Sequence, residues 1–212
     1  MNVFNKNPPS DFTRFVHMVE DPSDLTVFSE KTYPAVIWSR QVLPKIQNWI
    51  DQIDPNLLPN VRKVLHKTVI QETLEHVFNN TRIPQSNQLD WLLKDITKLG
   101  KVFSNLMQVD FLRLRLDVVS TNSCRKFHVD SVTGRLICTY RGEGTQYGIS
   151  RDENEPVDIF SVPTGSPVLL SGLLSSKENG LELLHRSPPI EGTGVKRFVL
   201  VFDPIIDPEN EG

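Results

Sequence analysis

Apolar residues recur at helical spacing through the first half of the chain. A short amphipathic helix is predicted over residues 43–53, where apolar positions follow one another every three or four residues. A second, less regular helical stretch is predicted over residues 59–78. The third is the clearest, since one apolar stripe continues for several turns and Ser86 or Asn87 can cap its start. The stripe consists of Leu89, Leu92, Leu93, Ile96, Leu99, Phe103 and Leu106.

Downstream of the third helix the pattern changes from helical spacing to strict alternation. Leu112, Leu114 and Leu116 alternate with charged residues, which is typical of a strand with one buried and one polar face. Further strands are predicted after it, separated by turns rich in glycine and proline. The expected strands cover about residues 111–119, 125–130, 134–141, 157–161, 167–171, 181–185 and 196–203.

These strands predict the fold class. No segment between them is long enough for a crossover helix, so the sheet is expected to be antiparallel. A series of short antiparallel strands suggests a jelly roll, a cupin-like barrel or a sandwich. Residues 1–40 lack a sustained period, and Val36-Ile37-Trp38 is their candidate for an edge strand. We therefore expect an α+β protein in which N-terminal helices pack on the outside of a C-terminal barrel.

The length of the chain suits one domain. At 212 residues it can bury a good-sized core. Within that domain we expect an arm and helical part over residues 1–107, a barrel over residues 108–206 and a disordered tail over residues 207–212.

Composition and charge argue against several classes of partner. Hydrophobic residues make up 38% of the chain and charged residues 23%, as in soluble globular proteins. A net charge of −3 gives no electrostatic footprint for nucleic acid or an anionic membrane. We find neither a signal peptide nor a membrane-spanning run, which predicts a cytoplasmic protein. Cys124 and Cys138 are too few for a disulfide scaffold and are expected to remain thiols.

The segment Phe127-His128-Val129-Asp130 carries the candidate chemistry. In an extended strand His128 and Asp130 share one face, because a single residue separates them. His185 supplies a third ligand type, and Arg197 follows it at the start of a strongly apolar strand. Two imidazoles and one carboxylate on one side of a metal leave the opposite positions open. A non-haem Fe(II) centre needs those open positions for a co-substrate and dioxygen.

Other interpretations of the same residues stay open at this level. His185 can be an ordinary core histidine, and Arg197 can be an outward-facing surface arginine. A zinc site that uses Cys124, His128 and His185 is conceivable. A cupin-like barrel can also hold a metal or ligand without turnover, or serve as a structural scaffold without a metal.

Several motifs carry a resemblance to known families. Residues 110–203 resemble the double-stranded β-helix core of the Fe(II)- and 2-oxoglutarate-dependent dioxygenases, through the His-x-Asp motif, Val162-Pro163-Thr164-Gly165 before an apolar strand, and the distal histidine segment. The chain resembles more closely an uncharacterised bacterial family of unknown function (DUF1826-like), and this resemblance extends over the helical half. The motifs that carry it are Phe127-His128-Val129-Asp130, the stretch from Cys138 to Thr145, and His185-Arg186-Ser187-Pro188.

The resemblance to the dioxygenases implies an activity and a set of ligands. By that resemblance the protein is an oxidoreductase that hydroxylates an unknown substrate, and His128, Asp130 and His185 hold Fe(II). Arg197 is then the partner of the far carboxylate of the co-substrate 2-oxoglutarate. A guanidinium suits this role because its planar fork can bind a carboxylate through two hydrogen bonds.

Three further residues are weaker candidates. One of the neighbours Thr139 and Tyr140 must face inward, and Tyr140 is our choice for a second hydrogen bond to the co-substrate, with a structural tyrosine as the alternative. Arg113 and Arg115 lie on the polar face of one predicted strand, and they can hold an acidic substrate at the mouth of the barrel. A solvated face paired with nearby acids is the simpler interpretation of these two arginines. The sequence does not indicate whether the substrate is a small molecule or a protein.

Overall fold

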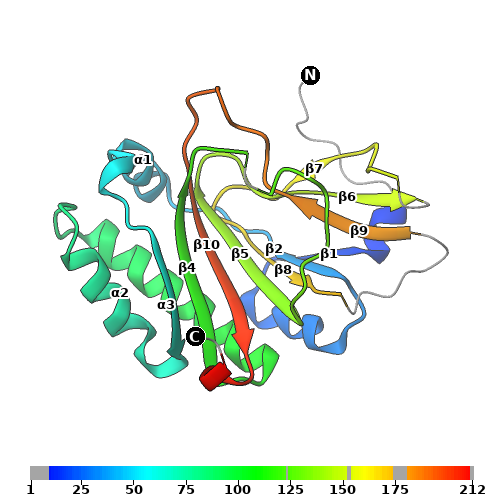
Figure 1. Cartoon of the computed structure of the whole chain (residues 1–212), viewed down its shortest axis with the longest axis horizontal. Coiled ribbons are helices and arrows are strands. Elements are labelled where there is room, and N and C mark those ends of the chain that lie inside the picture. Colours follow the sequence, from blue (N-terminus) through cyan, green and yellow to red (C-terminus); the bar gives the residue numbers. More distant parts are fainter. Residues whose placement is uncertain (1–9, 123, 152–153, 174–180, 211–212) are drawn as a thin grey trace.

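Two β-sheets, one large and one small, form the framework of the protein (Figure 1). The computed structural model describes residues 10–122, 124–151, 154–173 and 181–210. The large sheet has the strand order β1-β2-β8-β5-β10-β4-β3, and the small sheet has the order β7-β6-β9. The strands are β1 Val16–Val19, β2 Ala35–Trp38, β3 Val61–His66, β4 Phe111–Val119, β5 Gly134–Arg141, β6 Gln146–Arg151, β7 Phe160–Ser161, β8 Pro167–Ser171, β9 Leu181–Arg186 and β10 Arg197–Ile205.

The chain passes back and forth between the two sheets. It leaves β5 of the large sheet for β6 and β7 of the small one, then returns to β8, crosses to β9 and returns to β10. The neighbouring strands of this part pair antiparallel. Such alternation between two antiparallel sheets is the topology of a jelly roll. The strands β1 and β2 differ, because they form a parallel pair.

Strand alternation creates two separate hydrophobic clusters. On β10, Phe198 and Leu200 belong to the cluster that also contains the helices, which we call the outer cluster. Val199 and Val201 belong to the cluster that contains residues of both sheets, which we call the inner cluster. The inner cluster joins the two sheets, because Tyr147 of β6 is also part of it. Successive side chains of a strand point to opposite faces, so this division follows directly from the period of two.

The helices contribute to the outer cluster. The long helix α3 supplies Leu92, Ile96 and Phe103 to it, and Figure 1 shows α2 and α3 beside the large sheet. Ser86 caps α3 as predicted, since its hydroxyl accepts a hydrogen bond of 3.2 Å from the Leu89 amide. The α-helices are α1 Pro44–Gln52, α2 Ile70–Asn79 and α3 Asn87–Met107, and the 3₁₀ segments are Ser10–Arg14, Pro22–Glu30, Pro55–Leu57, Lys67–Val69 and Pro208–Asn210. No helix within the described ranges combines the length and the apolar character needed to span a bilayer.

The N-terminal part differs from the helical unit that we expected. Three strands from before residue 107, β1, β2 and β3, extend the large sheet. Val36-Ile37-Trp38 forms a strand as predicted, but β2 lies between β1 and β8 and is not at the edge. The expected helix over 59–78 is wrong for residues 61–66, which pair with β4 as an edge strand before α2 begins at Ile70.

The C-terminal part also departs from expectation in places. The predicted strand over 125–130 is a loop that makes a single bridge, from His128 to His185. The predicted strand over 157–161 is reduced to Phe160–Ser161. The strand β6 was missed because it lies in a glycine-rich stretch. The tail expected to be disordered from residue 207 forms a 3₁₀ turn at Pro208–Asn210, and residues 211–212 lie outside the described part of the chain.

Candidate metal centre

His128 and His185 are brought together by one antiparallel bridge. His185 lies on β9, and His128 lies on the loop between β4 and β5. The amide of each histidine donates a 3.0 Å hydrogen bond to the carbonyl oxygen of the other. This pair of bonds adds the loop to the small sheet at a single position. The two imidazoles therefore lie side by side, with ring centroids 4.6 Å apart.

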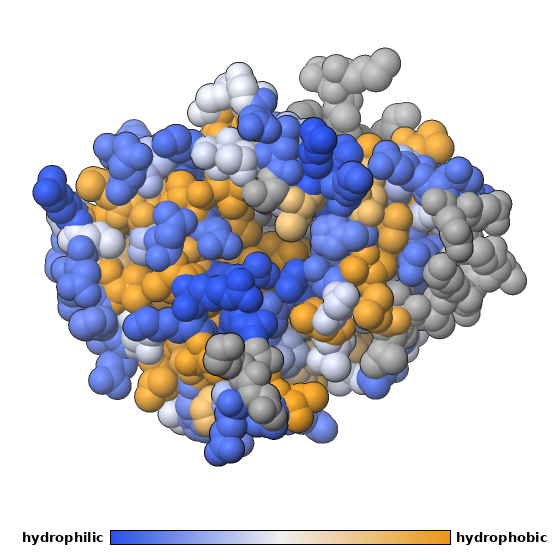
Figure 2. Space-filling view, in the orientation of Figure 1, coloured by the Kyte–Doolittle hydropathy of each residue, from blue (hydrophilic) through white to orange (hydrophobic). Residues whose placement is uncertain are grey.

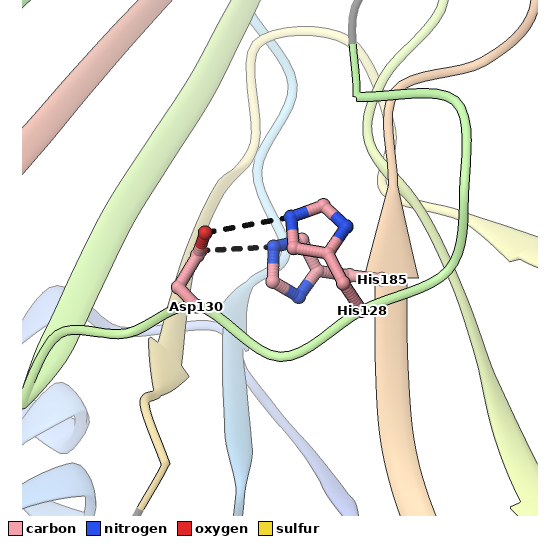
Figure 3. A group of neighbouring side chains, drawn as sticks. All are labelled: His128, Asp130 and His185. Carbon is pink, nitrogen blue, oxygen red and sulfur yellow. Dashed lines mark ion pairs between the residues drawn. The ribbon is translucent and has the colours of Figure 1, made fainter. Parts of the chain in front are cut away.

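Asp130 completes a group of three ligand-type side chains. Figure 3 shows both imidazoles directed toward its carboxylate. His128 Nε2 lies 3.4 Å from Oδ1 of Asp130, and His185 Nε2 lies 3.0 Å from Oδ2. One ligand atom from each residue can be chosen so that all three lie within 4.8 Å of one another. Since 128–130 is loop rather than strand, the bridge and the turn of this loop bring the residues together, and a shared strand face does not.

The polar atoms at this centre fit a cation. Oδ2 of Asp130 is buried and has no hydrogen-bond partner among the described residues, although His185 Nε2 is only 3.0 Å away. His128 Nδ1 lies 2.8 Å from the Lys126 carbonyl oxygen, so Nδ1 carries the proton and donates it there. The hydrogen bond with Asp130 raises the pKa of His128 although partial burial opposes it. When His128 is neutral its Nε2 is free to ligate, and a cation can take the place of the proton between Nε2 and the carboxylate.

A chain of charged side chains continues from Asp130. Its Oδ1 accepts a hydrogen bond from Arg135 Nη1, and Arg135 donates two more to Asp203, at 2.6 and 3.0 Å. Arg115 also lies beside Asp203, with its Nη2 3.6 Å from Oδ2. Burial alone would raise the pKa of Asp130, but the two histidines and Arg135 hold it well below its usual value. The carboxylate is thus kept ionised and ready to ligate.

Arg197 lies inside the protein, and no ion pair joins it to an acid among the described residues. Its side chain is 1% exposed, which excludes the interpretation as a surface arginine. The guanidinium donates to the Glu143 carbonyl oxygen at 2.5 Å and to the hydroxyls of Ser187 and Thr139, both at 3.2 Å. Burial lowers the pKa of Arg197 to about 10, because the positive charge is removed from water and the negative charge of Glu143 offsets this only in part.

The structure corrects our expectation for Tyr140. Its side chain is fully buried in the outer cluster, and its hydroxyl donates a 2.6 Å hydrogen bond to Asp95 of α3. The preceding residue, Thr139, is the one that points toward Arg197. Sequence left a choice between these two neighbours, and strand alternation turns Tyr140 away from the candidate centre.

The other sequence candidates have different positions. Cys124 is exposed and does not belong to the group of neighbouring ligand atoms, so the zinc site that would use it is not the arrangement that we observe. Arg113 and Arg115 alternate with leucines of the outer cluster and therefore lie on the inner face of β4. Arg115 is partly buried and lies near Asp203, so the interpretation as a fully solvated face is too simple.

Sequence reasoning missed several residues around the site. Arg135 and Asp203, which connect to Asp130, were not singled out, and neither were Glu143 and Ser187 around Arg197, while Thr139 was considered and set aside in favour of Tyr140. One signal was available, because an aspartate directly after five apolar residues of a buried strand needs a cationic partner. Arg197 contacts the backbone carbonyl oxygen of Glu143. Because every residue has such an oxygen, this contact cannot be predicted from the sequence.

Comparison with solved structures shows the fold. The dioxygenase for auxin oxidation 1 from Arabidopsis thaliana, as a 2-oxoglutarate complex, matches with a TM-score of 0.53 and 8% identity, over 92% of this chain and 94% of that one. The dioxygenase for auxin oxidation in rice gives 0.46 and 10%, over 92% and 84%. A protein from Burkholderia pseudomallei of the 2OG-Fe(II) oxygenase family gives 0.46 and 11%, over 88% and 94%. Of these three matches the first exceeds 0.5, and the fold assignment depends on it.

Comparison with protein families and with curated proteins gives two further results. Among curated proteins, none matches this sequence. The model of the family described as "Protein of unknown function (DUF1826)" matches residues 19–203, a range that contains the three clustered ligand residues and Arg197. The resemblance seen in the sequence is thereby confirmed, and the chain belongs to the DUF1826 family.

Proposed function

We propose that this protein is a non-haem Fe(II)- and 2-oxoglutarate-dependent oxygenase that hydroxylates its substrate. The observation that carries the proposal is the combination of two sites inside one jelly roll. Two imidazoles and a carboxylate converge as a ligand set, and a buried arginine whose described hydrogen-bond acceptors are all neutral oxygens lies on the last strand. Either feature alone has simpler explanations, whereas together they match the needs of one metal and one dicarboxylate.

His128, Asp130 and His185 would hold the metal. Two neutral nitrogens and one carboxylate suit Fe(II) and leave positions for other ligands. With 2-oxoglutarate bound, such an ion supplies the activation of dioxygen, coupled to conversion of the co-substrate to succinate and carbon dioxide. The Lys126 carbonyl oxygen fixes the ring of His128, and Arg135 fixes the carboxylate of Asp130. These second contacts keep the ligands in place before the metal arrives.

Arg197 would bind the far carboxylate of 2-oxoglutarate. Its guanidinium is already oriented by Glu143, Thr139 and Ser187, and all three contacts are to neutral oxygens. A carboxylate would give the buried charge a counter-charge, in a setting where a charge-assisted pair is strong. Apolar side chains on the same face of β10, such as Val199 and Val201, keep water away from this region.

The similar fold supports the choice of co-substrate. The Arabidopsis protein that shares this fold was solved with 2-oxoglutarate bound. At 8% identity the likeness extends to the fold and no further. In this chain it is the buried Arg197 that favours 2-oxoglutarate as the co-substrate.

The test is co-substrate binding to anaerobic protein loaded with Fe(II). We expect a charge-transfer absorption band when 2-oxoglutarate is added, because its 2-oxo acid end would chelate the metal. Replacing Arg197 by Gln should weaken 2-oxoglutarate binding at least about tenfold, since a charge-assisted pair is lost. The metal content should stay unchanged, because the described contacts of Arg197 include none of the three ligands.

The matched control is Arg82→Gln, which makes the same substitution at an exposed position between α2 and α3. It should leave both metal content and 2-oxoglutarate affinity at wild-type values. Absence of the band together with absence of binding in calorimetry would rule out the oxygenase. A protein that still holds one metal ion would then be a non-catalytic metal-binding jelly roll. If binding is present but equal in Arg197→Gln, the oxygenase stands and the assignment of Arg197 is wrong.

A further inference from the structure

Arginines gather on the inner face of the large sheet, at the end where Asp130 lies. Arg115 of β4 is opposite Arg62 of β3 in register, and Arg113 is two residues away on the same face. Arg135 of β5 joins them through Asp203. Figure 2 shows strongly hydrophilic side chains across the middle of the molecule, over β4, β10 and β5. Positive charge is thus concentrated beside the candidate metal centre.

Arg115 is incompletely paired within this group. Its ion pair is with Asp203, at 3.6 Å, and both oxygens of that aspartate already accept shorter bonds from Arg135. Nε of Arg115 is buried and has no hydrogen-bond partner among the described residues. Burial lowers the pKa of Arg115 in spite of Asp203. A guanidinium in this state has unused donors and gains from an added anion.

Asp117 does not provide the missing partner. It lies two residues from Arg115 on the same face of β4, and it opposes Val199 of β10 in register. Its negative charge acts to raise the pKa of Arg115, but no ion pair joins the two side chains in the described part of the chain. The described residues at this end thus bring four arginines, Arg62, Arg113, Arg115 and Arg135, together with three acids, Asp117, Asp130 and Asp203, and Asp130 is shared with the metal centre. The surplus of positive charge is local, since the whole chain carries a net charge of −3.

Arg115 is linked to the metal centre through two intermediate residues. Its guanidinium contacts Asp203, which binds Arg135, which in turn binds Asp130. An anion on the free donors of Arg115 would therefore lie next to the residues that hold the third metal ligand. A molecule bound there by its anionic end can extend the rest of its body toward the metal.

Arg115 and Arg197 are separate anion sites. In the pairing of β4 with β10, Arg115 opposes Val201 whereas Arg197 opposes Val119. The two positions are four residues apart along the strands, which corresponds to about 13 Å of extended chain. Their guanidinium groups also have different partners, since Arg197 contacts Thr139 and Ser187. One arginine can hold the co-substrate while the other holds a second anion.

We propose that Arg115 binds an oxyanion of the oxidised substrate, so that the substrate is an organic carboxylate or phosphate. This inference rests on the proposed function, because it names the substrate class of the same site. The anionic group binds to the guanidinium of Arg115, and the body of the substrate lies toward the ligands of the metal. Arg135 and Asp203 hold Arg115 in place and position Asp130 as well.

The test is calorimetry with simple probes on the protein that already holds Fe(II) and 2-oxoglutarate under anaerobic conditions. The probes are benzoate, phenyl phosphate and the neutral benzamide, which separate carboxylate, phosphate and uncharged ligands. We expect one or both anions to bind and benzamide to bind at least about tenfold more weakly. Arg115→Gln should reduce anion affinity about tenfold or more, since a charge-assisted hydrogen bond is removed. Arg82→Gln should not change it.

Two measurements keep the outcomes distinct. Metal content and the 2-oxoglutarate charge-transfer band are recorded for each variant, so a failure of the proposed function appears in wild type before any probe is added. A second variant, Arg115→Lys, keeps the charge but loses the fork, and it should retain part of the affinity. The inference is overturned if wild type binds the co-substrate but binds anions and benzamide alike. It is also overturned if Arg197→Gln abolishes probe binding while Arg115→Gln does not.

Discussion

At the scale of single residues, Asp203 is the acid that links Arg115 and Arg135 in the series of ion pairs that leads to Asp130. Its side chain is 3% exposed, and it faces Arg135 and Arg115 at once. The pKa of Arg135 is raised, although burial opposes its charge, because Asp203 and Asp130 lie beside it. Removal of one partner from a buried pair leaves the other charge uncompensated, which costs far more than the pair itself contributes.

Asp203→Asn should therefore destabilise the protein by about 3 kcal/mol in urea unfolding. We also expect weaker metal binding, because Arg135 is then free to draw Asp130 away from the histidines. The control is Asp110→Asn, which removes an exposed ion pair with Lys67. That change should alter the free energy of unfolding by about 0.5 kcal/mol or less. Equal changes in the free energy of unfolding for the two substitutions would show that the buried ion pairs of Asp203 contribute no more to stability than an exposed pair.

At the scale of elements, the contact of α3 with β10 has no spare room. Gly100 of α3 lies against Ile70 and Phe202, and an added Cβ would be 2.7 Å from Ile70 Cδ1 and 2.9 Å from Phe202 Cζ. Both neighbours are completely buried, so neither can move away cheaply. The glycine is required by the close approach of the helix to the sheet, and the cost to helix propensity is accepted in exchange.

Gly100→Ala tests this packing. Alanine should gain about 1 kcal/mol of helix propensity and lose about 3 kcal/mol through overpacking, for a net loss of about 2 kcal/mol. The free energy of urea unfolding measures the difference. Adding Phe202→Leu should recover part of the loss, because the two sites are in direct contact. Lys101→Ala, on the exposed side of the same helix, should stay within about 0.5 kcal/mol of wild type. A stabilised Gly100→Ala would contradict the account.

Edge strand β3 shows why sequence patterns mislead at this scale. Val61 and Leu65 are spaced as in a helix, and the good helix of α2 follows shortly after. The structure pairs Val61–His66 with β4 and leaves Arg62 and Lys63 exposed, as edge strands often do. Residues 61–66 form a strand because they can pair with the edge of β4. This tertiary contact cannot be recognised from the local spacing of apolar residues.

The glycine-rich loop after β5 had a role that sequence could not assign. A Cβ on Gly144 would lie 1.8 Å from the Val162 carbonyl oxygen. The loop therefore passes directly against the backbone that follows β7. This tight path places the Glu143 carbonyl oxygen on Arg197. The loop therefore positions the candidate co-substrate arginine, and β6 begins immediately after it at Gln146.

At the scale of the whole molecule, the strands of the jelly roll could be predicted from the sequence. The backbone contact that brings the three ligand residues together could not. Alternating apolar residues located β4, β5, β8, β9 and β10 to within a few residues, because each has one face in the outer cluster or the inner one. The set of His128, Asp130 and His185 was named correctly as neighbours. The predicted reason, a common strand face, was wrong, since a loop and one bridge to β9 bring them together. Which residue of the pair Thr139 and Tyr140 faces inward also needed the register of β5 with β10.

The central claim is that these three side chains bind one metal ion. The His128→Ala and His185→Ala variants test it more cleanly than a change at Asp130, because loss of Asp130 would also remove one of the two acids that pair with Arg135. The control is His76→Ala, on the exposed side of α2.

The decisive measurement is elemental analysis of protein loaded anaerobically with Fe(II) and then desalted, with circular dichroism as the check of fold. The account predicts about one ion per chain in wild type and in His76→Ala, and loss of most of the metal in His128→Ala and His185→Ala with unchanged spectra. Stoichiometric metal in both of these folded variants would contradict it.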